Sequence, residues 1–262
     1  MSDSHREEPR ASGTTADRGA LTLSGVLLLA GFLVNAIQRR ILHPTGEEDN
    51  HEPIFTEYAA SEWVATHFAE FVLVLVALAG LLVLCRALRR ETPFLALLAG
   101  GAIIATGATW AVLQAVDGIT LKQAVDAWVA ASGPEKATRY ADAETVRWIE
   151  WGLQSYFRVL LGLAFLLVGA AAVLSRLIPS WLGVLLVIGG LLSIVQGFSV
   201  GYEGLESGLP GRRRNRLPGR RSRLHRRPAH CQPPSARAEH QRGEYLVRAR
   251  HRSVGLVRYA AP

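Results

Sequence analysis

Long apolar blocks are the feature that most restricts how this chain can fold. Five nearly uncharged stretches lie at residues 21–37, 68–85, 94–116, 156–174 and 181–201. A helix that crosses the ~30 Å hydrocarbon core of a bilayer needs about 20 mostly apolar residues. The blocks therefore predict an all-α fold, a polytopic bundle of five transmembrane helices over residues 21–205, and they argue against a soluble domain.

The first block leaves two interpretations open. Small residues at Val34 and Ala36 suit a signal-peptidase site, so residues 21–37 would be a cleaved signal peptide. However, residues 1–20 are long for such a leader and contain four acidic residues. We therefore expect a retained helix that is preceded by a disordered N-terminal arm over residues 1–20.

Arginines between the blocks predict the orientation of the chain. The N-terminal arm, the connection after the second block and the turn after the fourth block carry Arg6, Arg10, Arg18, Arg86, Arg89, Arg90 and Arg176. If all five blocks span, these segments share one side, and basic residues favour the cytoplasmic side. We expect a cell-membrane protein with a cytoplasmic N-terminus, so that segments 38–67 and 117–155 face outside.

The segment 117–155 contains signals for helices. Thr120 with Gln123 and Ser132 with Glu135 have the spacing of capping boxes, and Pro134 suits a first helical turn. We expect a short helix over about residues 121–131 and a second helix from about residue 134 into the fourth block.

Aromatic residues gather near the expected membrane boundary. Trp and Tyr are enriched where a membrane meets water. The predicted interfacial aromatics are Trp63, Trp148, Trp151 and Tyr156.

Ionisable residues at the ends of the blocks are the candidates for a functional site, because charge within a span is costly. His67 and Glu70 are three residues apart and share one helical face. We expect one polar cavity, open to the outside, that holds a small polar ligand, a metal ion or a relayed proton. Its candidate residues are His67, Glu70, Asp117, Arg158 and Glu203. A purely structural interpretation stays open, in which Arg158 pairs with one carboxylate and the others reach the interface.

No motif in the sequence assigns a reaction. Segment 43–63 holds two histidines and six acidic residues, but their spacing matches no metal loop, so we predict no metal site. Haem needs two axial ligands, and only His67 lies near a span. The nucleotide-binding, hydrolase, zinc-protease and CxxC signatures are missing. Catalytic residues and cofactors stay unassigned, and an enzyme is not expected.

Several short motifs carry a resemblance. They are Asn35 with His43-Pro44, Trp63 with His67, Asp117-Gly118, VRWIEWGLQSYFR at 146–158 and VGYEG at 200–204. In these motifs the chain resembles a family of small bacterial multi-pass membrane proteins of unknown function, over about residues 20–205. The resemblance implies a six-helix bundle and no particular activity. The chain departs from that pattern after residue 205, where the sixth helix is missing.

The C-terminal segment 206–262 differs from the rest in charge. Residues 211–262 carry 15 arginines, no lysine and two acidic residues, whereas the other 210 residues carry 14 basic and 20 acidic residues. A nucleic-acid arm and a polybasic segment on anionic lipid would both need a cytoplasmic tail. Five spans from a cytoplasmic N-terminus place the tail outside instead.

A shifted reading frame is the third interpretation of this tail, and we favour it. Arginine CGN codons read one base later begin with G and encode Val, Ala, Gly or Asp, which suit the missing sixth helix. The tail lacks apolar periodicity, so we predict that it is disordered.

These observations predict an integral membrane protein that binds or passes a small polar species at the outer-leaflet cavity. Its expected partners are the lipid bilayer and other membrane subunits, and nucleic acid is not expected. A membrane enzyme or a redox or metal-binding subunit that uses His67 and nearby carboxylates is one alternative. Binding of anionic lipid or nucleic acid through the tail is another.

Overall fold

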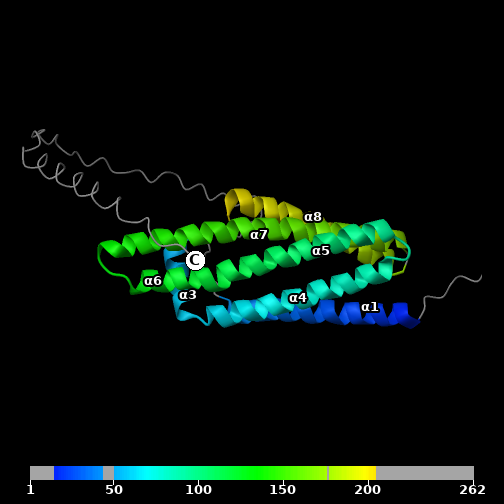
Figure 1. Cartoon of the computed structure of the whole chain (residues 1–262), viewed down its shortest axis with the longest axis horizontal. Coiled ribbons are helices and arrows are strands. Elements are labelled where there is room, and N and C mark those ends of the chain that lie inside the picture. Colours follow the sequence, from blue (N-terminus) through cyan, green and yellow to red (C-terminus); the bar gives the residue numbers. More distant parts are fainter. Residues whose placement is uncertain (1–14, 44–49, 176, 205–262) are drawn as a thin grey trace, which may run out of the picture. The chain divides into compact units, whose positions relative to one another are not determined.

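The computed structural model describes residues 15–43, 50–175 and 177–204. These residues are almost entirely helical, and no strand occurs among them (Figure 1). Three segments with predictions lie outside the described residues. They are the tail 206–262, residues 1–14 of the N-terminal arm, and residues 44–49, which include three of the acidic residues of segment 43–63.

In the part of the chain that the structure describes, five helices are long and apolar enough to cross a membrane. The first combines α1 (Thr15–Leu28), a π-helical turn η1 (Leu29–Leu33) and α2 (Val34–Leu42). The third combines α5 (Pro93–Gln114), a π-helical segment η2 (Ala115–Leu121) and α6 (Lys122–Ala130). The others are α4 (Trp63–Leu88), α7 (Pro134–Ser175) and α8 (Ser180–Glu203). They contain the five apolar blocks, which confirms the predicted all-α fold and indicates a multi-pass membrane protein.

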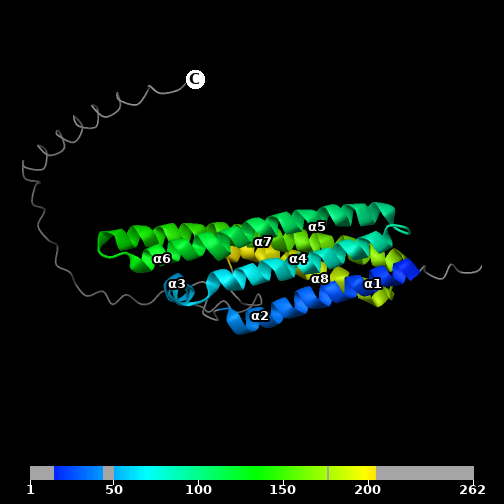
Figure 2. The same cartoon turned by 60° about the horizontal axis from the view of Figure 1, so that its bottom comes forward.

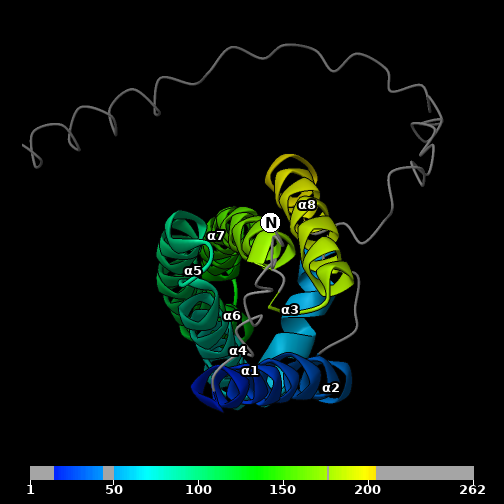
Figure 3. The same cartoon turned by 90° about the vertical axis from the view of Figure 1, so that its right-hand side faces the viewer.

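The five long helices pack in a simple order. α4 contacts both α1 and α5, and α7 contacts both α5 and α8, so the order is α1, α4, α5, α7, α8 (Figure 3). Buried apolar residues such as Leu81, Ile103 and Val168 fill the space between α4, α5 and α7. Large apolar residues such as Leu29 and Val195 remain exposed on the first and last of the long helices, as expected for surfaces that face lipid.

Glycines bring α7 and α8 close together. A Cβ atom on Gly190 would lie 2.7 Å from the main-chain oxygen of Gly162, and one on Gly197 would lie 2.9 Å from that of Ser155. Small residues let helix backbones approach in this way. In contrast, Gly100 and Gly101 of α5 have open space beside them and do not serve helix contact.

Two helix boundaries differ from the sequence expectation. Residues 15–20 are helical and do not belong to a disordered arm. The capping box at Thr120 is wrong, because η2 carries the helix continuously from α5 into α6 and the Thr120 hydroxyl donates to the Ala115 oxygen at 3.1 Å. The second expected helix does begin at Pro134.

A second apolar cluster forms at one end of the bundle, where the short helix α3 (His51–Ala60) contacts α6 (Figures 1 and 2). Its buried members are Ile54, Phe55, Tyr58, Trp63, Leu121, Val125, Trp128 and Ala143. This cluster fixes the first turns of α4 against η2 and α7, and the buried charges described next lie beside it.

Candidate functional site

The first two turns of α4 direct a polar face into the protein. Trp63, His67 and Glu70 follow one another at helical spacing, and all three are buried. The Trp63 indole Nε1 donates to the main-chain oxygen of Asp117 at 2.8 Å, which ties α4 to η2. The first two turns of a long apolar helix thus bury a histidine and a carboxylate.

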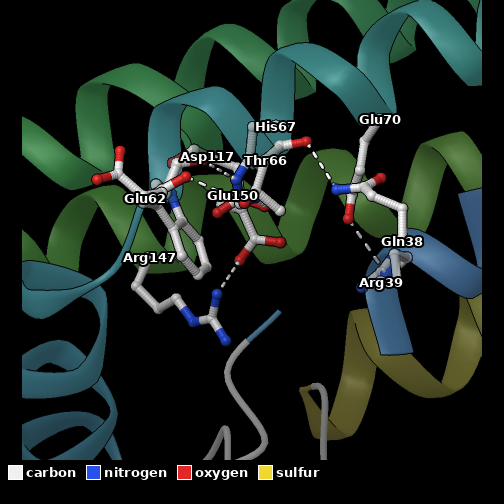
Figure 4. A network of polar contacts seen from close by, with 10 residues as sticks. Gln38, Arg39, Glu62, Thr66, His67, Glu70, Asp117, Arg147 and Glu150 are labelled. Atoms are coloured by element: carbon white, nitrogen blue, oxygen red, sulfur yellow. Dashed lines mark hydrogen bonds and ion pairs between the residues drawn. The ribbon is translucent and has the colours of Figure 1, made fainter. Parts of the chain in front are cut away.

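His67 is hydrogen-bonded through both ring nitrogens (Figure 4). Its Nδ1 donates to the Trp63 main-chain oxygen at 2.8 Å, and its Nε2 lies 3.2 Å from Oδ2 of Asp117. A carbonyl oxygen only accepts, so Nδ1 carries a proton. The contact between Nε2 and the carboxyl group needs a second proton, so the His67–Asp117 pair holds one proton more than a neutral imidazole with a carboxylate.

The π-helical segment η2 places Asp117 opposite His67. Segments of this kind inside α-helices are rare and often mark functional sites. The next residue, Gly118, allows the close approach, since a Cβ atom there would lie 2.6 Å from the His67 Cβ. The pairing of the two side chains therefore depends on a local helix irregularity and on one residue without a side chain.

Glu70 connects this site to the first helix. Its Oε1 lies 3.6 Å from Nε of the half-exposed Arg39 on α2, so the two form an ion pair. One position earlier on α2, Gln38 Nε2 donates to the main-chain oxygen of Thr66 at 3.1 Å. In Figure 4 Glu70 points toward α2, while His67 points toward Asp117.

A second buried ion pair lies on α7. Arg147 Nη1 donates to Glu150 Oε2 at 2.9 Å, and each side chain is only 3% exposed. The guanidinium also lies 5.7 Å and 5.5 Å from the rings of Tyr58 and Trp151, a cation–π geometry. Arg147 lies in segment 117–155, so from the sequence it is expected only as a basic residue of a connection between two apolar blocks. The i, i+3 spacing of Arg147 and Glu150 is the sequence signal that could have predicted this ion pair.

A pocket of about 190 Å³ lies beside His67, between α4 and the α5–η2 helix. Its lining residues are Val64, His67, Phe68, Phe71, Ala111, Gln114, Ala115, Gly118 and Ile119. His67 and Gln114 supply the polar groups of this wall. Gln114 is buried, and its Oε1 accepts no hydrogen bond from any residue that the structure describes.

The structure brings together three of the five expected cavity residues. His67, Glu70 and Asp117 lie in the network of Figure 4. Arg158 instead donates to Gln196 Oε1 on α8 at 2.9 Å. Glu203, at the end of α8, is exposed and lies 3.4 Å from the Ser199 hydroxyl. Both contacts involve α8, so the structure does not place these two residues with His67.

The four expected interfacial aromatics separate into two pairs. Trp148 and Tyr156 are exposed, at 56% and 69%. Trp63 and Trp151 are buried against protein, at 1% and 7%. The sequence pattern could not separate the pairs, because α3 covers the side of the bundle on which the buried pair lies.

Two further histidines lie at this end, and one of them, His43, lies beside the site, with its ring 5.9 Å from that of His67. His51 Nδ1 lies 3.0 Å from Glu144 Oε1, and its ring packs against Phe55, Trp148 and Trp151. The His43 ring lies 5.2 Å from that of Trp63. Among the residues with described positions, no three His, Cys, Asp or Glu side chains come together as metal ligands would.

Comparison with known proteins gives a family and no activity. No curated protein and no solved structure matches the chain. One family model matches residues 23–208, which is most of the chain and close to the range of the resemblance seen in the sequence. The chain therefore belongs to the family described as Domain of unknown function (DUF4386).

Proposed function

We propose that this protein is a cell-membrane protein that binds a small molecule in the pocket beside His67. In this proposal the N-terminus is cytoplasmic and the site lies toward the outer leaflet. The observation that carries this proposal is the position of His67. Its side chain is buried, its Nε2 lies 3.2 Å from Oδ2 of Asp117, and it also lines the pocket. Ligand pockets combine a mostly apolar wall with a few polar groups at fixed positions.

The cost of burying charge supports a functional site. Five buried histidine, acidic and arginine side chains lie at one end of the bundle: His51, His67, Glu70, Arg147 and Glu150. Apolar side chains of similar volume commonly stabilise a fold as well as a buried ion pair does. Stability alone therefore gives little reason to gather these groups beside a pocket, whereas recognition of a ligand does.

A membrane enzyme is the second candidate, and the His67–Asp117 pair favours it. A carboxylate that orients a histidine is a common arrangement in acid–base catalysis. In this case the bound molecule would leave chemically changed, whereas a binding protein would release it unchanged.

Filling the pocket tests for binding of a ligand whose identity is unknown. Ala115 is exposed and lines the pocket, so we expect Ala115→Phe to occupy the space. Ala108→Phe is the matched control, because Ala108 is exposed two turns earlier on the same face and lies outside the pocket lining. The measurement is mass spectrometry of small molecules extracted from purified protein.

We expect a molecule that co-purifies with the unaltered protein and with Ala108→Phe and is lost from Ala115→Phe. Identical extracts from the unaltered protein and both variants would contradict binding at this pocket. Recovery of the same molecule in two chemical forms, one consumed with time, would favour the enzyme.

A further inference from the structure

The last described helix, α8, carries an exposed face with the spacing of a helix–helix contact. We propose that two copies of the protein pair through this face, with their α8 helices parallel and side by side in the membrane. The face takes no part in the pocket beside His67, so pairing and ligand binding can fail independently.

A different face of α8 is already occupied by α7. Gly183, Gly190 and Gly197 recur every seven residues and are buried. A Cβ atom on each of them would lie 2.7–2.9 Å from a main-chain oxygen of α7. Seven residues make close to two helical turns, so this spacing lets a second helix follow α8 along its length.

A second stripe with the same repeat runs along the exposed face. Its members, which we call the exposed stripe of α8, are Leu182, Leu185, Gly189, Leu192, Gln196, Ser199 and Glu203. Steps of three and four residues alternate between them, as at the a and d positions of a two-stranded coiled coil. Leu185 and Leu192 are 55% and 59% exposed, and a Cβ atom on Gly189 would meet nothing within 4 Å. Among the described elements only α7 packs extensively on α8, so the stripe is open to another helix.

Two polar residues of the stripe are evidence against lipid as its cover. Gln196 and Ser199 are both exposed. With 24 residues, α8 is about 36 Å long and exceeds the ~30 Å hydrocarbon core by little. Gln196 precedes the last residue of α8 by about 10 Å, so it lies inside that core. Polar side chains at this depth normally face protein or water.

The amide of Gln196 favours a copy of the same chain as its partner. Its Oε1 accepts a hydrogen bond from Arg158 Nη1 at 2.9 Å. An amide offers two N–H donors and an oxygen with two lone pairs, so it can donate and accept at the same time. A two-fold axis along the membrane normal places the Gln196 side chains of two copies opposite each other at one depth. Each amide can then donate to the oxygen of the other, and a single polar residue at an a position sets the register of such a pair.

The rest of the stripe suits the same arrangement. Gly189 lets two backbones approach, as small residues do between membrane helices. Leu182, Leu185 and Leu192 supply apolar contacts on either side of it. Glu203 is the last residue of α8, where water screens the charges of two copies from each other.

Disulfide crosslinking of the full chain in isolated membranes tests this pairing. In a background with Cys85→Ala and Cys231→Ser, the variant Leu192→Cys places one thiol on the stripe. The matched control is Leu191→Cys, because Leu191 is 52% exposed at almost the same depth but points about 100° away. A disulfide needs two Cα atoms within about 7 Å, so it forms between facing residues.

Two forms of the chain with different tags are co-expressed, and copper phenanthroline is the oxidant. We expect Leu192→Cys to give a covalent dimer that contains both tags. We expect this product to be lost in Leu191→Cys. The dimer should persist when the membranes are diluted with added lipid, because a specific pair does not depend on random collision.

Two variants in the Leu192→Cys protein test the hydrogen bond between copies. Gln196→Leu should lower the ratio of dimer to monomer about threefold, as the loss of an average hydrogen bond between membrane helices implies. The matched control is Val195→Leu, since Val195 is the adjacent residue, is 64% exposed and lies outside the stripe, and it should leave the ratio unchanged. The comparison of Leu192→Cys with Leu191→Cys remains decisive even if Gln196→Leu does not fold.

Equal crosslinking of Leu191→Cys and Leu192→Cys overturns the pairing, because random collision does not select one face. The absence of any product from Leu192→Cys overturns it as well and leaves lipid as the cover. A heavier product that never contains both tags shows that another protein occupies the stripe. A dimer yield that Gln196→Leu leaves unchanged overturns Gln196 as the residue that joins the copies.

Discussion

At the scale of single residues, the burial of an ion pair decides how much its side chains contribute to stability. Arg147 and Glu150 form a pair that is almost fully buried, whereas Arg139 and Glu135 form an exposed pair on the same helix. A partner removed from a buried pair leaves an uncompensated charge, but an exposed pair is screened by water. Two pairs with similar chemistry therefore make very different contributions to stability.

We predict that Arg147→Met lowers the free energy of unfolding by about 3–5 kcal/mol, because it removes the cation of a buried ion pair with Glu150. Arg139→Met is the matched control and should cost no more than about 0.5 kcal/mol. Both values come from denaturant or thermal unfolding of protein in micelles. Similar losses for the two variants would show that Arg147 is not held by a buried pair.

The sequence located part of this site and missed part of it for a physical reason. His67, Glu70 and Asp117 were recognisable because each interrupts or borders an apolar block, where a polar group is costly. Arg158 also interrupts an apolar block, yet its side chain donates a hydrogen bond to Gln196 on α8. The rule identifies a polar residue at membrane depth, but the choice of partner depends on which helices pack together.

At the scale of elements, the segment η2 does most to shape the site. It keeps α5 and α6 in one continuous helix and still turns Asp117 toward His67. Hydropathy predicted the long helices around it. It could not predict η2, because Thr120 and Gln123 have a spacing that fits a helix interior as well as a helix start.

We predict that Gly118→Ala disrupts the site, because the added methyl group would lie 2.6 Å from the His67 Cβ and push α4 away from η2. The melting temperature should fall, and the pocket should lose its co-purified molecule. Gly101→Ala is the matched control, since a Cβ there meets nothing within 4 Å and alanine favours the helix. An unchanged melting temperature and ligand content for Gly118→Ala would contradict the close contact.

At the scale of the whole molecule, the number of membrane crossings between two connections decides whether they share a side. The connection between α4 and α5 and the connection between α6 and α7 are separated by one helix that is long enough to cross a membrane, so a crossing by that helix would place them on opposite sides. In the proposed orientation, which the arginines favour, the first connection is cytoplasmic. The end of the bundle that holds His67 and Asp117 would then face outward.

Cysteine labelling in intact cells tests this arrangement most directly. In a background with Cys85→Ala and Cys231→Ser, the variants Glu91→Cys and Ser132→Cys each place one thiol in one of these connections. We predict that a membrane-impermeant maleimide labels Ser132→Cys in intact cells and labels Glu91→Cys only after permeabilisation. Labelling of both variants in intact cells would contradict a membrane crossing between them, and labelling of Glu91→Cys alone would reverse the orientation.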